Sequence, residues 1–218
     1  MPSIHLIGRS TPIQPGKIVC LGRNYVDHIK ELGNEIPDKP VIFIKPSTSI
    51  LPDGGSIIIP DYSTDCHYEV ELAVLIGKTG KNISEEAAFE HVAGYGVAID
   101  LTLRDVQSQH KEKGLPWEIA KGFDTACPLS DFVPADLVPD PGNLPITLTV
   151  NGEMRQNGNT GMMMRNIAQI IAEFSKIFTL EEGDVLLTGT PAGVGPIVTG
   201  DILVGKIDQV GELTVSVG

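Results

Sequence analysis

Short apolar runs separated by glycine and proline dominate the pattern of this chain. Runs of this kind occupy residues 17–22, 40–46, 56–60 and 67–77. Residues 184–217 alternate similar runs with glycine-rich turns. Runs rich in valine and isoleucine that end at turn-forming residues are typical of β-strands, so the pattern predicts mostly β-structure.

A hairpin and a long helix are the clearest local predictions. Two alternating runs at 146–156 flank Asn151-Gly152, a dipeptide that accepts the positive φ angles of a type I′ turn. The helix is predicted over Met163–Phe178, because one apolar face recurs at helical spacing. That face consists of Ile167, Ile170, Ile171, Phe174 and Ile177.

Two further helices are expected from their end signals. After Ser84 the chain continues with acidic residues, which suit the first turn of a helix, and Gly94 supplies a stop. A shorter helical piece follows the first strand and is closed by Gly33 and Pro37.

Length and composition favour one domain. The chain has 218 residues, 41% of them hydrophobic, and shows no internal repeat or charged linker. We therefore expect a single domain over 1–218, with residues 1–16 as a lead-in. Its fold class is α+β and mostly β: a mixed β-roll or sandwich with a few flanking helices.

Charge and cysteine content restrict the partners and the compartment. A net charge of −12 argues against nucleic acid or an anionic membrane as a partner. No run reaches the length of a membrane span, and we expect no secretory signal. Cys20, Cys66 and Cys127 fit neither a zinc pattern nor a disulfide framework, so we expect reduced thiols in the cytoplasm.

Three carboxylates in two apolar runs are the main candidates for chemistry. Glu69 and Glu71 lie two residues apart in HYEVELAVLIG and therefore project from one face of a strand. Asp100 lies in a second apolar run, where a charge is otherwise unfavourable. A divalent cation neutralises such a group best, and oxygen ligands suit Mg²⁺, Mn²⁺ or Ca²⁺.

The alternative for this strand is a solvated outer face, the commoner origin of alternating glutamates. Ala73 and Leu75 argue against it, because they continue the glutamate face as apolar residues. We therefore expect both faces of the strand to be buried and the carboxylates to need a partner.

His28 and Glu31 form a candidate general base. They lie three residues apart in a predicted helix, where the two side chains share a face. A carboxylate on one imidazole nitrogen raises the basicity of the other. The alternative is an ordinary exposed pair on a surface helix.

Lys121 is a candidate for stabilising an oxyanion or enolate, because the apolar residues around it favour partial burial. The alternative is a lysine that extends its charged end into solvent. The polar side chains of Arg23, Lys45, Arg104 and Gln107 fall at or near the ends of predicted elements and suit an anionic substrate.

The segment 186–196, LLTGTPAGVGP, is a strand followed by a glycine-rich loop. It lacks the lysine of a phosphate-binding loop, so a nucleotide site is not expected. Its backbone N–H groups and Thr190 could still hold a carboxylate. The chain also has no GxSxG motif, which argues against a serine hydrolase.

Taken together, these motifs resemble the fumarylacetoacetate hydrolase family, in its short single-domain branch of acylpyruvate hydrolases and oxaloacetate decarboxylases. Seven strings carry the resemblance in family order, from about residue 17 to the C-terminus. They are GRNYVDHIKELG, FIKP, HYEVELAVLIG, GYGVAIDLTLRDVQ, PWEIAKGFDTACPLS, VNGEMRQ and GDVLLTGTPAGVGP.

The resemblance implies a role for each candidate residue. The metal ligands would be Glu69, Glu71 and Asp100, and the ion Mg²⁺ or Mn²⁺. His28 and Glu31 would activate water from a lid over residues 24–37, and Lys121 would be their positively charged catalytic partner. The implied substrate contacts are Arg23, Lys45, Gln107 and Thr190. A small 2-oxo acid would be the substrate, and the chain would form a homodimer.

The function implied is metal-dependent hydrolysis of a C–C bond in an acylpyruvate through a pyruvate enolate. Oxaloacetate decarboxylation passes through the same enolate, so it stays an alternative, as does an isomerase or decarboxylase of muconate-type 2-oxo acids. A further alternative is a module that binds dicarboxylates without turnover, but binding alone would not need a base opposite a metal. A two-carboxylate glycosidase needs its carboxylates across a cleft, not on one strand face.

Overall fold

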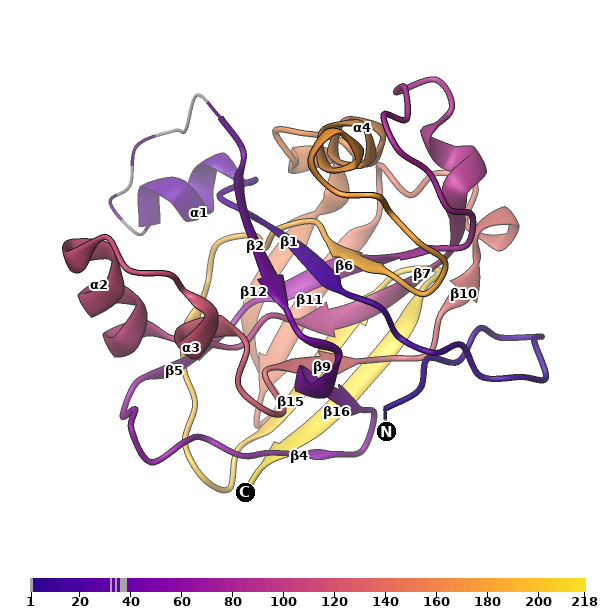
Figure 1. Ribbon diagram of the computed structural model, residues 1–218. Helices are drawn as coiled ribbons and strands as arrows, with labels where there is room; N and C mark the ends of the chain where they lie inside the picture. The colour runs from indigo at the N-terminus through magenta and orange to yellow at the C-terminus, as the bar shows by residue number, and fades with distance from the viewer. Residues whose placement is uncertain (1, 32, 34, 36–38) are drawn as a thin grey trace.

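A computed structural model describes residues 2–31, 33, 35 and 39–218 of the chain (Figure 1). Its strands form one large curled sheet and two smaller sheets, as the mostly β prediction requires. The predicted lid, 24–37, falls partly outside the described residues.

The large sheet has eight strands. In spatial order these are β2 (Val41–Lys45), β1 (Ile18–Gly22), β13 (Val185–Leu187), β6 (Val70–Ile76), β7 (Val92–Ile99), β9 (Cys127–Leu129) and β3 (Ile50–Pro52), while β10 (Val133–Pro134) pairs with β7.

A five-stranded and a three-stranded sheet contain the remaining named strands of the described residues. The first runs β12 (Glu153–Asn159), β11 (Pro145–Val150), β15 (Ile202–Ile207), β16 (Gly211–Val217) and β4 (Ser56–Ile57). The second runs β14 (Gly195–Pro196), β5 (Cys66–Tyr68) and β8 (Thr102–Leu103).

The described residues include α1 (Val26–Glu31), α2 (Arg104–Lys113), α3 (Glu118–Lys121) and α4 (Ile167–Ile177). Short 3₁₀ turns occupy Ser47–Ser49, Ala88–His91, Ala135–Leu137 and Thr160–Met162. In Figure 1, α1 and α2 flank the same side of the large sheet, and α4 lies apart from them. Among the described residues, no helix combines the length and the apolar character that spanning a membrane requires.

Strand β6 separates two apolar cores, because it is buried on both faces. Val70 and Leu72 belong to the larger core, whereas Ala73 and Leu75 belong to the smaller one. The prediction that both faces are buried is confirmed. Any charge on this strand must therefore find its partners inside the protein.

The predicted lead-in contributes to the smaller core. Ile4 and Ile13 pair through an isolated antiparallel bridge, and both side chains are buried there. The three cysteines are buried free thiols. Burial raises the pKa of Cys66 and of Cys127 to about 12, so both stay protonated and act as apolar packing groups.

The hairpin prediction is confirmed. Strands β11 and β12 pair antiparallel, and Asn151 and Gly152 have φ angles of 53° and 81°. Positive values at both positions are what a type I′ turn needs.

The longest helix begins later than predicted. Helix α4 starts at Ile167 rather than Met163, because Asn166 caps it and exchanges capping-box hydrogen bonds with Gln169. Its apolar face is buried as expected except at Ile177, which is 54% exposed in the last turn.

The helix predicted after Ser84 is wrong. A 3₁₀ turn at Ala88–His91 leads directly into β7, whose residues pair with β6. Gly94 lies inside this strand, where a Cβ atom would come within 2.5 Å of the Val133 carbonyl oxygen. The glycine therefore permits a close strand approach instead of ending a helix.

Candidate active site and metal centre

The three predicted carboxylates meet in one place. Glu69 lies between β5 and β6, Glu71 is on β6, and Asp100 follows β7, the neighbouring strand. One carboxylate oxygen from each lies within 4.8 Å of the other two. The exposed fractions are 5%, 2% and 1%, so these are buried charges and not a solvated strand face.

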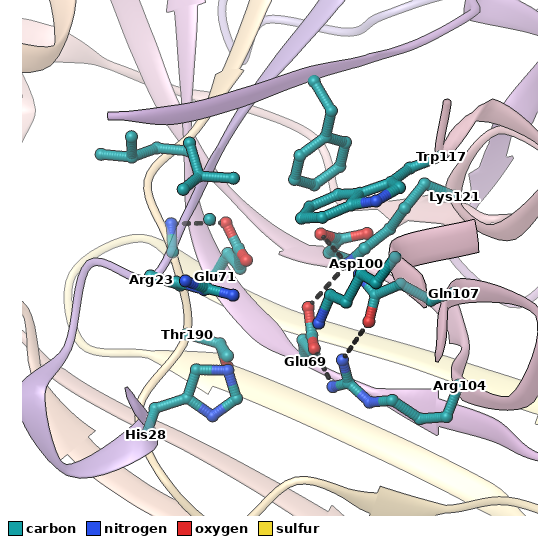
Figure 2. A pocket seen from close by; sticks show the side chains of 16 residues that line it. Arg23, His28, Glu69, Glu71, Asp100, Arg104, Gln107, Trp117, Lys121 and Thr190 are labelled. Carbon is teal, nitrogen blue, oxygen red and sulfur yellow. Dashed lines mark hydrogen bonds and ion pairs between the residues drawn. The ribbon is translucent and has the colours of Figure 1, made fainter. Parts of the chain in front are cut away.

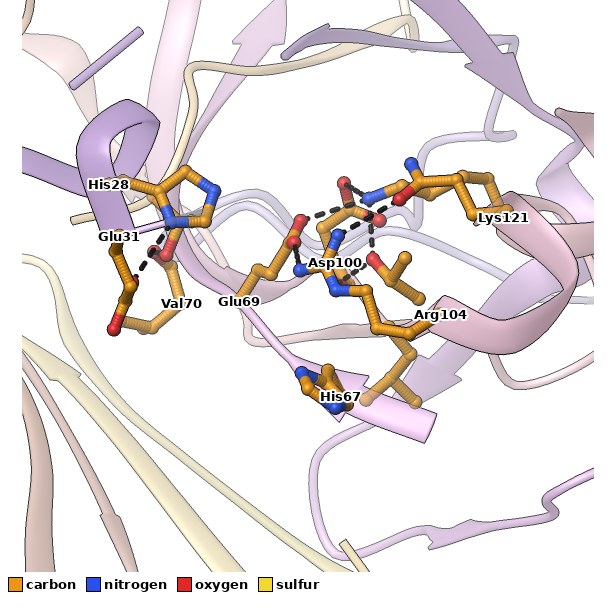
Figure 3. A network of polar contacts seen from close by, with 12 residues as sticks. His28, Glu31, His67, Glu69, Val70, Asp100, Arg104 and Lys121 are labelled. Atoms are coloured by element: carbon orange, nitrogen blue, oxygen red, sulfur yellow. Dashed lines mark hydrogen bonds and ion pairs between the residues drawn. The ribbon is translucent and has the colours of Figure 1, made fainter. Parts of the chain in front are cut away.

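Cationic side chains already neutralise part of this charge. The Lys121 ammonium donates to Glu69 Oε2 at 2.9 Å, to Asp100 Oδ2 at 2.7 Å and to the Thr102 hydroxyl at 2.5 Å. Arg104 donates to the other oxygen of Glu69 (Figure 3). Lys121 is only 3% exposed, which excludes the solvent-extended alternative.

The ionisation of these groups follows from their neighbours. Burial alone would raise the pKa of Glu69, but Lys121 and Arg104 bring it well below its usual range. Burial would likewise lower the pKa of Lys121, yet Asp100 and Glu69 hold it above the ordinary value. Both groups are therefore charged at neutral pH.

Glu71 differs from its neighbours. Its carboxylate accepts a hydrogen bond of 2.6 Å from the Gly189 N–H. Burial, with the charges of Asp100 and Glu69, nevertheless raises its pKa well above the usual range. The protein's own cations are thus too few to stabilise the ionised form of Glu71 beside the other two carboxylates.

These observations fit a divalent metal ion. The donors are all carboxylate oxygens, which hard cations prefer, and they are close enough to share one ion. A cation beside Glu71 would relieve the repulsion that keeps its pKa high.

His28 lies across the pocket from Trp117 (Figure 2), and Glu31 is its partner behind it on the same helix. The His28 Nδ1 is 3.4 Å from Glu31 Oε2, and only 6% of the histidine is exposed. Because a carboxylate only accepts hydrogen bonds, this contact assigns the proton to Nδ1 and leaves Nε2 as the basic nitrogen. The alternative of an exposed surface pair does not fit the burial of His28.

The ionisation of His28 suits a base. Burial lowers its pKa below the ordinary value, and Glu69 and Glu31 offset part of that effect. The imidazole is therefore neutral at pH 7 and able to accept a proton.

The pocket between these groups is rich in positive charge, although the whole chain is acidic. Arg23, Arg104 and Lys111 line it together with the residues already described. Burial, followed by the charges of Arg23 and Arg104, lowers the pKa of Lys111. Cations held this close to one another favour an anionic ligand between them.

Arg23 is placed by an unusual backbone. Its φ angle is +61°, a left-handed conformation that non-glycine residues seldom adopt. It follows β1 directly and brings its side chain to the pocket wall (Figure 2).

Lys45 is placed differently from the expectation. Its ammonium forms an ion pair of 2.8 Å with Asp100 Oδ1 and donates to the carbonyl oxygens of Leu101, Lys121 and Ala126. The residue is 0% exposed and does not line the pocket. Direct contact with substrate does not fit this position, and we interpret Lys45 as an internal counter-ion of Asp100.

Gln107 and Thr190 do line the pocket. The Gln107 carbonyl accepts a hydrogen bond of 3.0 Å from Arg104. The Thr190 hydroxyl donates to the Val70 carbonyl at 2.7 Å and accepts from Gln156 at 2.8 Å. Its proton is therefore already used within the protein.

Sequence reasoning missed two contributors, Lys111 and Gln156. The N–H groups of the glycine-rich loop bind carboxylates, as predicted, but these carboxylates are side chains of the protein itself and not of a ligand. Gly189 N–H binds Glu71, and Gly193 N–H binds both oxygens of Glu31, at 3.0 and 3.2 Å. Nothing in the local sequence identified these acceptors.

Comparison with known proteins confirms the resemblance over nearly the whole chain. The family model "Fumarylacetoacetate (FAA) hydrolase C-terminal" matches residues 17–218. A mitochondrial oxaloacetate tautomerase, FAHD1 of Bos taurus, is 52% identical over 184 residues, which cover 84% of this chain and 83% of that protein. A mitochondrial oxaloacetate decarboxylase of Dictyostelium discoideum is 49% identical over 188 residues, 86% of each chain.

A solved structure is also similar. Fumarylpyruvate hydrolase from Pseudomonas aeruginosa, in complex with Mn²⁺ and pyruvate, superimposes with a TM-score of 0.95 at 37% identity. The match covers 99% of this chain and 95% of that one.

Proposed function

Since the chain belongs to the fumarylacetoacetate hydrolase family of enzymes, we propose that it interconverts the keto and enol forms of a short 2-oxo dicarboxylic acid, with oxaloacetate as the substrate. The main support is the composition of one pocket. Arg23, Arg104 and Lys111 line it together with three buried carboxylates and a neutral histidine. The 52% identity to an oxaloacetate tautomerase favours this substrate.

The cofactor we propose is Mg²⁺ or Mn²⁺, held by Glu69, Glu71 and Asp100. Mn²⁺ is present in the similar fumarylpyruvate hydrolase structure. When bound, such an ion acts as a Lewis acid toward the 2-oxo group of the substrate.

The side chains account for the proton transfer. His28 Nε2 removes a proton from the carbon between the 2-oxo group and the distal carboxylate, and Glu31 stabilises the resulting imidazolium. Lys121 keeps its own proton and provides positive charge near the enolate oxygen. The enolate oxygen then takes up the proton carried by His28, directly or through water, which completes the conversion and restores the neutral imidazole. Arg23 and Lys111 hold the carboxylates of the substrate.

Acylpyruvate hydrolysis is the second candidate, favoured by the similarity to fumarylpyruvate hydrolase. His28 would then take a proton from water, which adds to the distal carbonyl. The C–C bond breaks, its electron pair forms the enolate of pyruvate, and that enolate takes up a proton. Decarboxylation of oxaloacetate reaches the same enolate by loss of CO₂.

The oligomeric state and the cellular location of the protein are also proposals. We propose a homodimer, which light scattering during size-exclusion chromatography tests directly. We also keep a cytoplasmic location, although the Bos taurus and Dictyostelium relatives are mitochondrial by name.

Parallel assays separate these activities. Ultraviolet absorbance follows loss of the oxaloacetate enol, and a coupled assay follows pyruvate released from oxaloacetate and from acetylpyruvate. Each is run with Mg²⁺, with Mn²⁺ and with EDTA. We expect metal-dependent enol loss that greatly exceeds pyruvate release.

Other results would change the assignment. Rapid pyruvate release from oxaloacetate would make the protein a decarboxylase, and rapid release from acetylpyruvate a hydrolase. Rates equal to the uncatalysed reactions with all substrates would contradict the proposal.

A further inference from the structure

Gln156 on β12 is a buried side chain whose polar atoms all have partners. Its Oε1 accepts from the Val70 N–H at 2.9 Å. Its Nε2 donates to the Thr190 hydroxyl and to the Pro191 carbonyl, both at 2.8 Å. The residue is 0% exposed, and it comes from the five-stranded sheet while its partners border the metal centre.

The Val70 peptide matters because it lies between two proposed metal ligands, Glu69 and Glu71. Val70 is the first residue of β6, just after β5 ends. Its N–H donates to the Gln156 side chain of another sheet and not to a neighbouring strand. Thr190 holds the Val70 carbonyl and is itself held by Gln156. Both polar groups of Val70 are therefore tied, directly or through one hydroxyl, to the same amide.

The same amide supports the glycine-rich loop. This loop, Gly189–Gly193, donates to Glu71 at its first residue and to Glu31 at its last. A Cβ atom at Gly193 would collide with the Arg155 carbonyl oxygen, so the loop lies directly on β12 beside Gln156. The hydrogen bond from Gln156 to Pro191 holds its middle.

We propose that Gln156 is a positioning residue for the metal centre. It fixes the Glu69–Glu71 segment relative to the Gly189–Gly193 loop, so that Glu71 is oriented before an ion binds. The inference rests on the proposed metal site but not on the identity of the substrate. Hydrogen bonds to ligands and their supports contribute to metal affinity because they reduce the reorganisation that binding requires.

Glutamine suits this position because it offers two donors and one acceptor in a fixed plane. Gln156→Met keeps the volume and removes all three hydrogen bonds. Thr190→Val is a milder change, which removes the acceptor of Gln156 and the donor to Val70.

The test is Mn²⁺ binding to metal-free protein, measured by isothermal titration calorimetry. We expect Gln156→Met to raise the Kd for Mn²⁺ by about 10- to 100-fold. Thr190→Val should raise it by a smaller factor. Thermal melts of each variant show how much stability is lost at the same time.

Ser175→Ala is the matched control. Ser175 is also fully buried, accepts from Ile83 N–H at 2.9 Å and donates to the Ala172 carbonyl at 3.0 Å, but it lies on α4. It should lower the melting temperature and leave the Kd unchanged.

An unchanged Kd in Gln156→Met would overturn the proposal, as would a loss of affinity equal to that of Ser175→Ala. If Gln156→Met does not fold, an unchanged Kd in Thr190→Val overturns it instead. No substrate is present in the titration, so a wrong substrate assignment leaves this test intact.

Discussion

The two sides of the pocket are held in different ways. On the metal side, the carboxylates are almost completely buried, and Asp100 pairs with Lys121 at 2.7 Å and with Lys45 at 2.8 Å. On the other side, His28 and Glu31 come from a six-residue helix and meet at 3.4 Å, with the Glu31 side chain 33% exposed. A substitution on the metal side leaves buried charges without their ion-pair partners and therefore lowers stability. A substitution on the helix side lowers mainly the rate of the reaction.

The largest effect is expected for Asp100→Ala. It removes a proposed ligand and leaves Lys45 and Lys121 without their common carboxylate. We expect loss of Mn²⁺ binding and of activity, and a fall in the free energy of unfolding of about 3–5 kcal/mol. Calorimetry, the enol assay and urea unfolding measure the three effects. Asp208→Ala, an exposed aspartate, is the control, and full turnover in Asp100→Ala would refute the ligand assignment.

His28→Ala should separate chemistry from metal binding. We expect enol conversion and any acetylpyruvate hydrolysis to fall by about 10²–10⁴-fold, because the proposed general base is lost. The Kd for Mn²⁺ should not change. Decarboxylation of oxaloacetate needs no base for its C–C cleavage, so an equal loss of that activity would argue against the assigned role.

Glu31→Gln should have a smaller effect, because the amide oxygen can still accept from Gly193 N–H while the charge beside His28 disappears. We expect kcat to fall by roughly tenfold and the melting temperature to stay close to that of the wild type. A loss as large as that of His28→Ala would mean that Glu31 contributes more than orientation.

The smallest expected effect concerns pH. Since burial lowers the pKa of His28, its base form persists below the ordinary pKa of 6.5, and the acidic limb of the kcat/KM profile, which reports the free enzyme, should lie there. The unfolded chain takes up the proton first as pH falls. This group's contribution to stability is therefore complete above pH 6.5 and declines below it, until the lower folded-state pKa is passed. An acidic limb above pH 6.5 would contradict the assignment.

Local patterns predicted much of the fold, and their failures have physical causes. The helix expected after Ser84 had suitable end residues, but pairing of β7 with β6 was the stronger interaction. Helix α2 was not predicted because its sequence is mostly polar, with Val106 and Gln107 as its buried residues. The predicted start of α4 was too early because apolar spacing alone does not locate the Asn166 cap, which begins the helix at Ile167.

The sequence by itself predicted several of the strands, the hairpin and the three candidate carboxylates, because each depends on residue type and short spacing. It also identified the family, through seven strings in order along the chain. Only the tertiary structure decided the partners of those groups. It placed Lys45 inside as a counter-ion, and brought Gly189, Gly193 and Gln156 to the carboxylates and to Val70. Such contacts join segments far apart in the chain, so they depend on strand pairing and sheet curvature, which no local pattern contains.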